Sequence, residues 1–385
     1  MEFDDHPFGI FACRALEYAR IMSRFVRFDA SELYRGTAFY VVGFVRHFRD
    51  SHTQFVFADA GCGESGNQSG AGNACDGHMR YVWTTMPILS IKHVTTYRYR
   101  EPVAFGEHRI MLRPRDDEDQ RLLQSALEIR PKPRELAWGR DRLGNHVAIA
   151  HFDDRSDELR VVSTICLEHT PNGFYEGDIK DYARIYPFSY IAEDWSRLRG
   201  FILPLSLEPE LRRWSDQFFR NGSADTHALL VDMTQTIRRT FRHVARHEKG
   251  IQDPIRTIAL GSGSCRDLAI LMIAVLRSRG IAARFVSGYV HLAEEEHEDE
   301  HQIAGGNTHA WVQGYVPGPG WVDFDPSAGV VGNQNLIRVA VVEHPRDAIP
   351  LQGTWYGSAS DHLAMQVAVT VKAALNDGAA MRSRS

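Results

Sequence analysis

The stretch Gly261-Ser262-Gly263-Ser264-Cys265-Arg266-Asp267-Leu268 predicts that a helix begins at Cys265. The apolar residues after it recur at three- and four-residue steps, as on one buried face of an α-helix: Leu268, Leu271, Met272, Val275 and Leu276. Gly280 ends this pattern, and Ser264 is a suitable N-cap residue. Cys265 therefore belongs to the first helical turn, where unpaired backbone N–H groups and the helix dipole favour a thiolate over a thiol.

A predicted hairpin downstream supplies the partners that a reactive thiolate needs. The segments His309–Val316 and Trp321–Asp325 read as strands, and Pro317-Gly318-Pro319-Gly320 between them reads as a turn. Such a hairpin brings His309 close to Asp325. A histidine held by a carboxylate can carry the proton of a leaving group, so the order Cys, His, Asp indicates nucleophilic catalysis at a carbonyl carbon. Strand alternation places Asp323 on the same face, as a rival carboxylate.

Several blocks of the chain resemble the transglutaminase-like superfamily, in particular bacterial transglutaminase-like proteins with a β-rich N-terminal domain. The blocks are Gly263–Asp267, Ala283–Tyr289, Thr308–Trp311 and Gly320–Ser327, with Thr96–Val103 and Met111–Arg115 in the β-rich part. The resemblance implies that Cys265 is the nucleophile, that His309 is the general base and acid, and that Asp325 is the orienting carboxylate. The family places its Asp directly before a Pro-Ser or Pro-Thr step, which selects Asp325 over Asp323.

The fold class expected from these patterns is α+β. A papain-like or transglutaminase-like core, with the helix of Cys265 packed on an antiparallel sheet that carries His309 and Asp325, follows a small antiparallel β domain. We expect the β domain at residues 81–170, the catalytic domain with C-terminal strands at 171–375, and a tail at 376–385. Residues 1–80 are unassigned. They form a disordered extension, or they result from a start assigned too far upstream of Met79 or Met86.

Composition narrows the class of protein further. The formal charge of −5 over 385 residues gives no basic footprint for nucleic acid, and no apolar run reaches the length of a membrane span. An odd number of scattered cysteines argues against a disulfide framework and for a reducing, cytoplasmic compartment. They are Cys13, Cys62, Cys75, Cys166 and Cys265. We expect a bacterial enzyme that acts on a protein or peptide substrate with neither cofactor nor metal; the sequence does not indicate the oligomeric state.

Three alternatives stay open at this point. The acyl group passes from Cys265 to an amine, as in a transglutaminase, or to water, as in a cysteine protease or amidase. A non-catalytic binding module that keeps the fold is the second possibility. A metal site built from Cys265, His309 and Asp325 is the third. Arg266 and Asp267, directly after the nucleophile, are expected to pair with neighbouring charges.

Overall fold

The computed structural model describes residues 54–56, 82–84 and 88–373, apart from 207, 220–221, 247–249 and 292–307. The chain divides into two compact units, Met1–Thr85 and Met86–Ser385. In the first unit, β1 (Gln54–Val56) pairs antiparallel with β2 (Val82–Thr84). The rest of residues 1–80 and the tail at 376–385 lie outside the described residues, so the expectations for both segments stay predictions.

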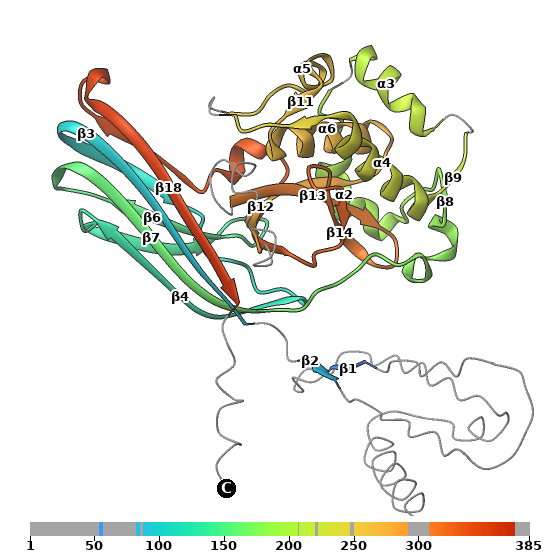
Figure 1. The fold of residues 1–385 in the computed structure, drawn as a ribbon, viewed down its shortest axis with the longest axis horizontal. Coiled ribbons are helices and arrows are strands. Elements are labelled where there is room, and N and C mark those ends of the chain that lie inside the picture. Colours follow the sequence, from blue (N-terminus) through green and yellow to red (C-terminus); the bar gives the residue numbers. More distant parts are fainter. Residues whose placement is uncertain are drawn as a thin grey trace, which may run out of the picture. The chain divides into compact units, whose positions relative to one another are not determined.

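The second unit opens with a seven-stranded antiparallel sheet built around one long strand. Its members are β3 (Ile88–Ile110), β4 (Gln120–Arg130), β5 (Glu135–Arg140), β6 (His146–His151), β7 (Arg155–His169), β17 (Leu351–Tyr356) and β18 (His362–Ala373). Strand β3 pairs with β7 from Ile88 onward and with β6 near its end. Figure 1 shows these long strands gathered beside the helical part of the unit. The predicted antiparallel β domain is confirmed.

The last two strands depart from the predicted domain boundary. The catalytic domain is predicted at residues 171–375, but β17 and β18, which lie in this range, pair with β3 of the first sheet. Strand β18 pairs with the first half of β3 and β17 with its second half, as Val369 opposite His93 and Leu351 opposite Ile110 show. With 23 residues, β3 is long enough to serve both strands, one after the other. The chain therefore leaves the first sheet and returns to it after the helical part.

The middle of the chain forms the helical part and a second sheet. Its longer helices are α2 (Ala192–Ile202), α3 (Pro209–Ser215), α4 (Thr226–Thr240), α5 (Pro254–Leu260) and α6 (Cys265–Ser278). Strands β12 (Ala283–Val290), β13 (Thr308–Val316), β14 (Gly320–Asp325), β15 (Val330–Val331) and β16 (Leu336–Val342) form a sheet in the order β15-β14-β13-β12-β16. This part also contains two separate two-stranded sheets. Strand β8 (Ile185–Tyr186) pairs with β9 (Ala224–Asp225), and β10 (Arg242–His243) pairs with β11 (Ser262–Gly263).

Helix α6 is the centre of the core in this part. Its residues from Leu268 to Leu276 are all buried, and they pack against one face of the second sheet through Val312 and Phe324. The helix begins at Cys265 and Gly280 follows it with a φ of 78°, as the sequence pattern predicts. The α+β arrangement of a nucleophile helix on an antiparallel sheet is thus confirmed (Figure 1).

The two sheets are joined by apolar and polar contacts. Ile91 and Ile165 of the first sheet share a buried cluster with Tyr289 and Ile337 of the second. Strand β16 lies at an edge of the second sheet, and unpaired edges need a cover. The side-chain amide of Gln120 both donates to and accepts from the backbone of Arg338, at 2.7 and 2.9 Å. The first sheet therefore covers the free edge of the second.

Among the helices that the structure describes, none is long and apolar enough to cross a membrane. The cytoplasmic location stays a prediction.

Candidate active site

The N-terminus of α6 is fixed by the carboxylate of Asp267. It accepts hydrogen bonds from the backbone N–H and the hydroxyl of Ser264, at 2.9 and 2.7 Å, and from the backbone N–H of Gln252. The guanidinium of Arg246 binds it as well, with Nε 2.8 Å from Oδ2. The expected pairing of Asp267 with a neighbouring charge is confirmed. Burial raises the pKa of Asp267, but these partners outweigh it and hold the pKa below its usual range.

Cys265 is the first residue of this helix, and its half-buried thiol lies between two imidazoles. The imidazoles of His243 and His309 both lie close enough to act on its pKa. Burial raises the pKa of the Cys265 thiol, but the two imidazoles outweigh burial and lower the pKa to about 6. A thiol with that pKa is mainly thiolate at neutral pH.

His309 connects this thiolate to Asp325. Its Nε2 donates to Oδ2 of Asp325 at 2.6 Å, which leaves Nδ1 as the ring nitrogen for the sulfur. Burial lowers the pKa of His309, but Asp325 and Cys265 together raise it well above its usual value. The carboxylate is held in turn by Ser327, whose hydroxyl donates to Oδ1 at 2.7 Å. The structure thus places the three predicted residues in one chain of contacts, Cys265 to His309 to Asp325.

Asp323, the rival carboxylate, bonds to other partners. Its Oδ1 accepts from the indole Nε1 of Trp311 at 2.6 Å, and its Oδ2 accepts from Nη1 of Arg338 at 3.0 Å. Trp311 in turn stacks on His309, with ring centroids 6.1 Å apart. Arg338 also pairs with Asp119, which lies just before the first residue of β4. The carboxylate nearest to His309 is therefore that of Asp325.

His243 is the site residue that sequence reasoning missed. It reaches the thiol because β10 pairs in parallel with β11, which places His243 beside Gly263. Each of these strands has two residues, so neither shows a periodicity that predicts the pairing. Arg338 was missed as well, because its partners Asp119 and Asp323 lie far from it in the chain and nothing local signals the network.

A metal centre is not supported by the geometry. Within the part of the chain that the structure describes, there is no group of three or more His, Cys, Asp or Glu side chains that could hold a metal ion. Cys265, His309 and Asp325 lie in series, and Nε2 of His309 is already bonded to Asp325. Three ligands of one ion would instead converge on a point.

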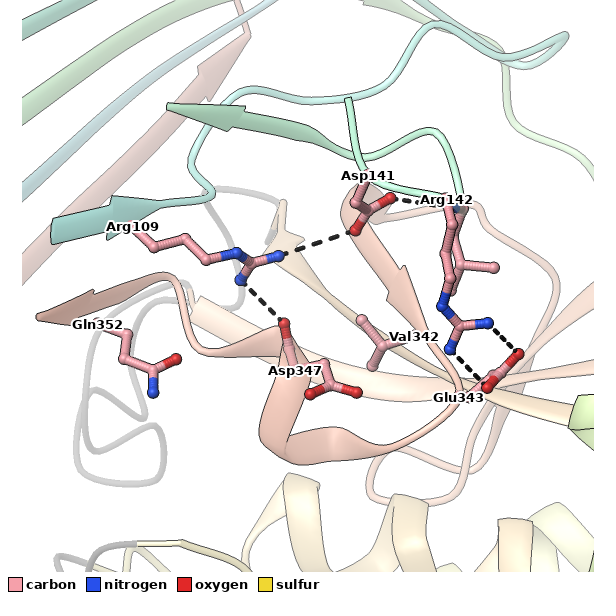
Figure 2. Close-up of a pocket in the computed structure, with 8 residues that line it drawn as sticks. Arg109, Asp141, Arg142, Val342, Glu343, Asp347 and Gln352 are labelled. Atoms are coloured by element: carbon pink, nitrogen blue, oxygen red, sulfur yellow. Dashed lines mark hydrogen bonds and ion pairs between the residues drawn. The ribbon is translucent and has the colours of Figure 1, made fainter. Parts of the chain in front are cut away.

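A cavity of about 480 Å³ lies elsewhere, between the two sheets (Figure 2). Its charged lining is paired internally. Arg142 binds Glu343 through both Nη atoms at 2.8 and 2.6 Å, and Arg109 donates to the carbonyl oxygen of Asp347 at 3.3 Å. None of Cys265, His309 and Asp325 lines this cavity. It is therefore separate from the candidate active site.

Two sequence families match consecutive parts of the chain. The family described as "Bacterial transglutaminase-like N-terminal region" matches residues 89–168, which contain β3 to β7. The "Transglutaminase-like superfamily" matches residues 212–326, which contain all three residues of the Cys265–His309–Asp325 chain. The chain belongs to the transglutaminase-like superfamily. The family expectation drawn from the sequence blocks is confirmed.

Individual relatives of this transglutaminase-like chain differ in what their names say. An uncharacterized protein of Mycobacterium tuberculosis is 27% identical over 298 residues, which are 73% of this chain and 91% of that protein. A protein-glutamine gamma-glutamyltransferase of Pseudomonas aeruginosa is 29% identical over 137 residues, which are 34% of this chain and 20% of that protein. A solved structure from Cytophaga hutchinsonii, named as a candidate cysteine protease, has a TM-score of 0.56 at 18% identity. That match covers 74% of this chain and 90% of the other, and at this identity it concerns the fold alone.

Proposed function

We propose that the protein catalyses thiol-dependent acyl transfer on protein or peptide amides. The observation that carries the proposal is the hydrogen bond of 2.6 Å by which Asp325 holds His309, next to Cys265 at the first position of α6. This environment lowers the pKa of the Cys265 thiol. A thiolate and an imidazolium in contact are the form in which a cysteine attacks a carbonyl carbon. A binding module that had merely kept the fold would not need a charged pair of this kind half-buried at a helix N-terminus.

The reaction begins when the Cys265 sulfur attacks the carbonyl carbon of a carboxamide. The new S–C bond pushes the carbonyl electron pair onto oxygen, which faces the free N–H groups at the start of α6. The tetrahedral intermediate collapses, the C–N bond breaks, and the proton of the His309 imidazolium passes to the departing nitrogen. Ammonia or an amine leaves, and the acyl group stays on Cys265 as a thioester.

The second half of the reaction releases the acyl group. A primary amine or a water molecule loses its proton to His309 and attacks the thioester, and Cys265 leaves as the thiolate. Asp325 stabilises the imidazolium in both halves and keeps the ring in place. With an amine as the acceptor the protein is a transglutaminase-like acyltransferase. With water it is a cysteine protease or amidase, the second candidate, for which the shared fold with the Cytophaga hutchinsonii structure is the supporting observation.

One experiment tests the proposal and separates the two acceptors. A glutamine-containing peptide is incubated with the protein, with and without a primary amine such as cadaverine. The masses of the products are then measured by mass spectrometry. We expect an amine adduct from a transferase, and a gain of one mass unit or a cut backbone from a hydrolase. Cys265→Ala must abolish either product, whereas Cys166→Ser, a control at the other described free cysteine, must keep it. If the wild type releases neither product from a panel of amides, the proposal is wrong.

A further inference from the structure

His243 contacts the nucleophile from a rigid position. Strand β10 runs parallel to β11, with backbone hydrogen bonds from Arg242 to Gly261 at 2.9 Å and from Val244 to Gly263 at 3.0 Å. These bonds lie on both sides of His243 in the sequence, so its backbone is fixed relative to the segment that enters α6. His243 lies opposite Gly263, two residues before Cys265, and its imidazole is one of the two that act on the thiol.

The two imidazoles at the sulfur are not equivalent. His309 carries Asp325 behind it, and this pair is the arrangement that shuttles a proton. His243 shows no bond to a carboxylate among the residues that the structure describes. An imidazole keeps an N–H donor whether it is neutral or charged, so His243 can donate a hydrogen bond without taking part in proton transfer.

A hydrogen-bond donor that lies beside the sulfur can also stabilise the oxyanion that forms later in the reaction. When the sulfur attacks, the carbonyl oxygen and the sulfur become bonded to one carbon atom. A donor beside the sulfur in the free protein is then close to the place where the oxyanion forms, and an oxyanion donor acts at a distance of about 3 Å. The backbone N–H of Cys265, at the first position of α6, has no partner within the helix.

We propose that His243 is a further catalytic residue, which donates its ring N–H to the oxyanion formed when Cys265 attacks the acyl donor. In the free protein the ring of His243 lies beside the thiolate. As the S–C bond forms, negative charge moves from sulfur to oxygen, and the N–H hydrogen-bonds to that oxygen. The inference rests on the proposed function, since it assigns a role within acyl transfer at Cys265.

The test compares two reactions of the same thiolate. Acylation by p-nitrophenyl acetate passes through an oxyanion and releases a burst of p-nitrophenol, whereas alkylation by iodoacetamide displaces iodide and forms no oxyanion. Both rates are measured at pH 9, and because both reactions use the thiolate, a change in the thiolate fraction cancels in their ratio. The quantity compared among variants is the ratio of the acylation rate to the alkylation rate.

The variants remove or keep a donor at this position. His243→Phe keeps a ring but no N–H, and we expect the ratio to fall by about 10²–10³-fold, the loss typical of one oxyanion donor. His243→Asn and His243→Gln carry amide N–H groups at the positions of Nδ1 and Nε2, and one of them should recover part of the ratio. An unchanged ratio in His243→Phe overturns the proposal, because the two rates then fall together or not at all. Failure of both amide variants to recover any of the ratio overturns the donor role.

The same assay separates this inference from the proposed function. If the wild type acylates on the ester and depends on His243, but no amide is ever converted, the proposed amide chemistry fails and the role of His243 stands. If amides are converted but the ratio is the same with and without His243, the proposed function stands and the role of His243 fails. A wild type that gives no ester burst and converts no amide, while iodoacetamide still labels Cys265, overturns both.

Discussion

Trp311 stacks on His309, with ring centroids 6.1 Å apart and ring planes inclined by 23°. The two residues are separated by one position on β13 and therefore share a face of the strand. Trp311 is fully buried, and its indole N–H is fixed by Asp323 at 2.6 Å. The plane of the His309 ring is thus set from one side by a tryptophan that cannot rotate, while Asp325 fixes its Nε2.

Room for this tryptophan depends on Gly288. A Cβ atom at that position would lie 2.7 Å from the Trp311 ring and 2.0 Å from the carbonyl oxygen of Ile337. Beyond Trp311, Asp323 binds Arg338, which pairs with Asp119 beside the first sheet. The orientation of His309 is therefore connected, contact by contact, to the sheet that the N-terminal family model covers.

The two carboxylates of β14 form a matched pair for mutagenesis. Asp325→Asn removes the charge that raises the pKa of His309, so the thiolate loses its imidazolium partner and the pKa of Cys265 should rise above about 6. We expect the acylation rate to fall by about 10²–10⁴-fold. Asp323→Asn should leave the pKa of the thiol near its original value and cost about 1–3 kcal/mol of unfolding free energy. Iodoacetamide labelling against pH and denaturant titration measure the two effects, and equal labelling curves for both variants would contradict this division.

Labelling of the wild type against pH provides a separate prediction. The pKa of Cys265 is lowered from 9.0 to about 6, so the thiolate persists at every pH above that value and is lost as the pH falls through it. The labelling rate should reach half of its maximum near pH 6. His309→Ala removes one of the two imidazoles that lower the pKa and should move the midpoint upward. Site-resolved mass spectrometry is required, with Cys166 in the same protein as the internal comparison. If the midpoint of labelling against pH is unchanged in His309→Ala, the assignment of a thiolate–imidazolium pair is wrong.

Much of this site was readable because its signals are local. The helix after Cys265 has an unbroken 3.6-residue apolar pattern, and the Pro317–Gly320 turn forces β13 and β14 to pair. The antiparallel β domain was also readable, from short strands separated by turn residues. The family blocks then chose Asp325 over Asp323, a choice that alternation alone left open.

The features that escaped prediction depend on pairings between distant segments. The parallel pair of β10 and β11 places His243 at the thiol, and it joins two-residue strands 20 positions apart. Strands β17 and β18 pair with β3 although about 250 residues separate them in the chain, and nothing in their own sequence indicates that pairing. Arg338 is buried beside three carboxylates only where the two sheets meet, and nothing in the sequence around it indicates this contact.

The entry to α6 offers a second pair of neighbouring residues. Asp267 is fully buried and bonded to Arg246, so Asp267→Ala takes the carboxylate away from the guanidinium and leaves three further donors without their acceptor: the backbone N–H groups of Gln252 and Ser264 and the hydroxyl of Ser264. Breaking a buried ion pair from one side costs about 3–5 kcal/mol, and we expect a loss of that size in chemical denaturation. Arg266→Ala, at the adjacent half-buried position, should change the unfolding free energy by less than about 0.5 kcal/mol. Comparable losses in the two variants would show that Asp267 does not have the role assigned to it.

Arg338 is the residue through which the network crosses to the first sheet, and it is 4% exposed. Arg338→Met leaves Asp323 buried and charged without its guanidinium, which should cost about 3–5 kcal/mol at neutral pH. Burial already raises the pKa of Asp323, and loss of Arg338 raises it further. The deficit relative to wild type should therefore shrink as the pH falls through the raised folded-state pKa of Asp323, first in the variant and then in wild type, because a protonated Asp323 no longer needs the guanidinium. Urea titrations of both proteins between pH 3 and 8 measure this difference.

Arg134→Met breaks an exposed pair with Asp153 and serves as the control with no pH-dependent deficit. A deficit for Arg338→Met that stays constant over this range would mean that lost packing, and not an uncompensated carboxylate, causes the instability.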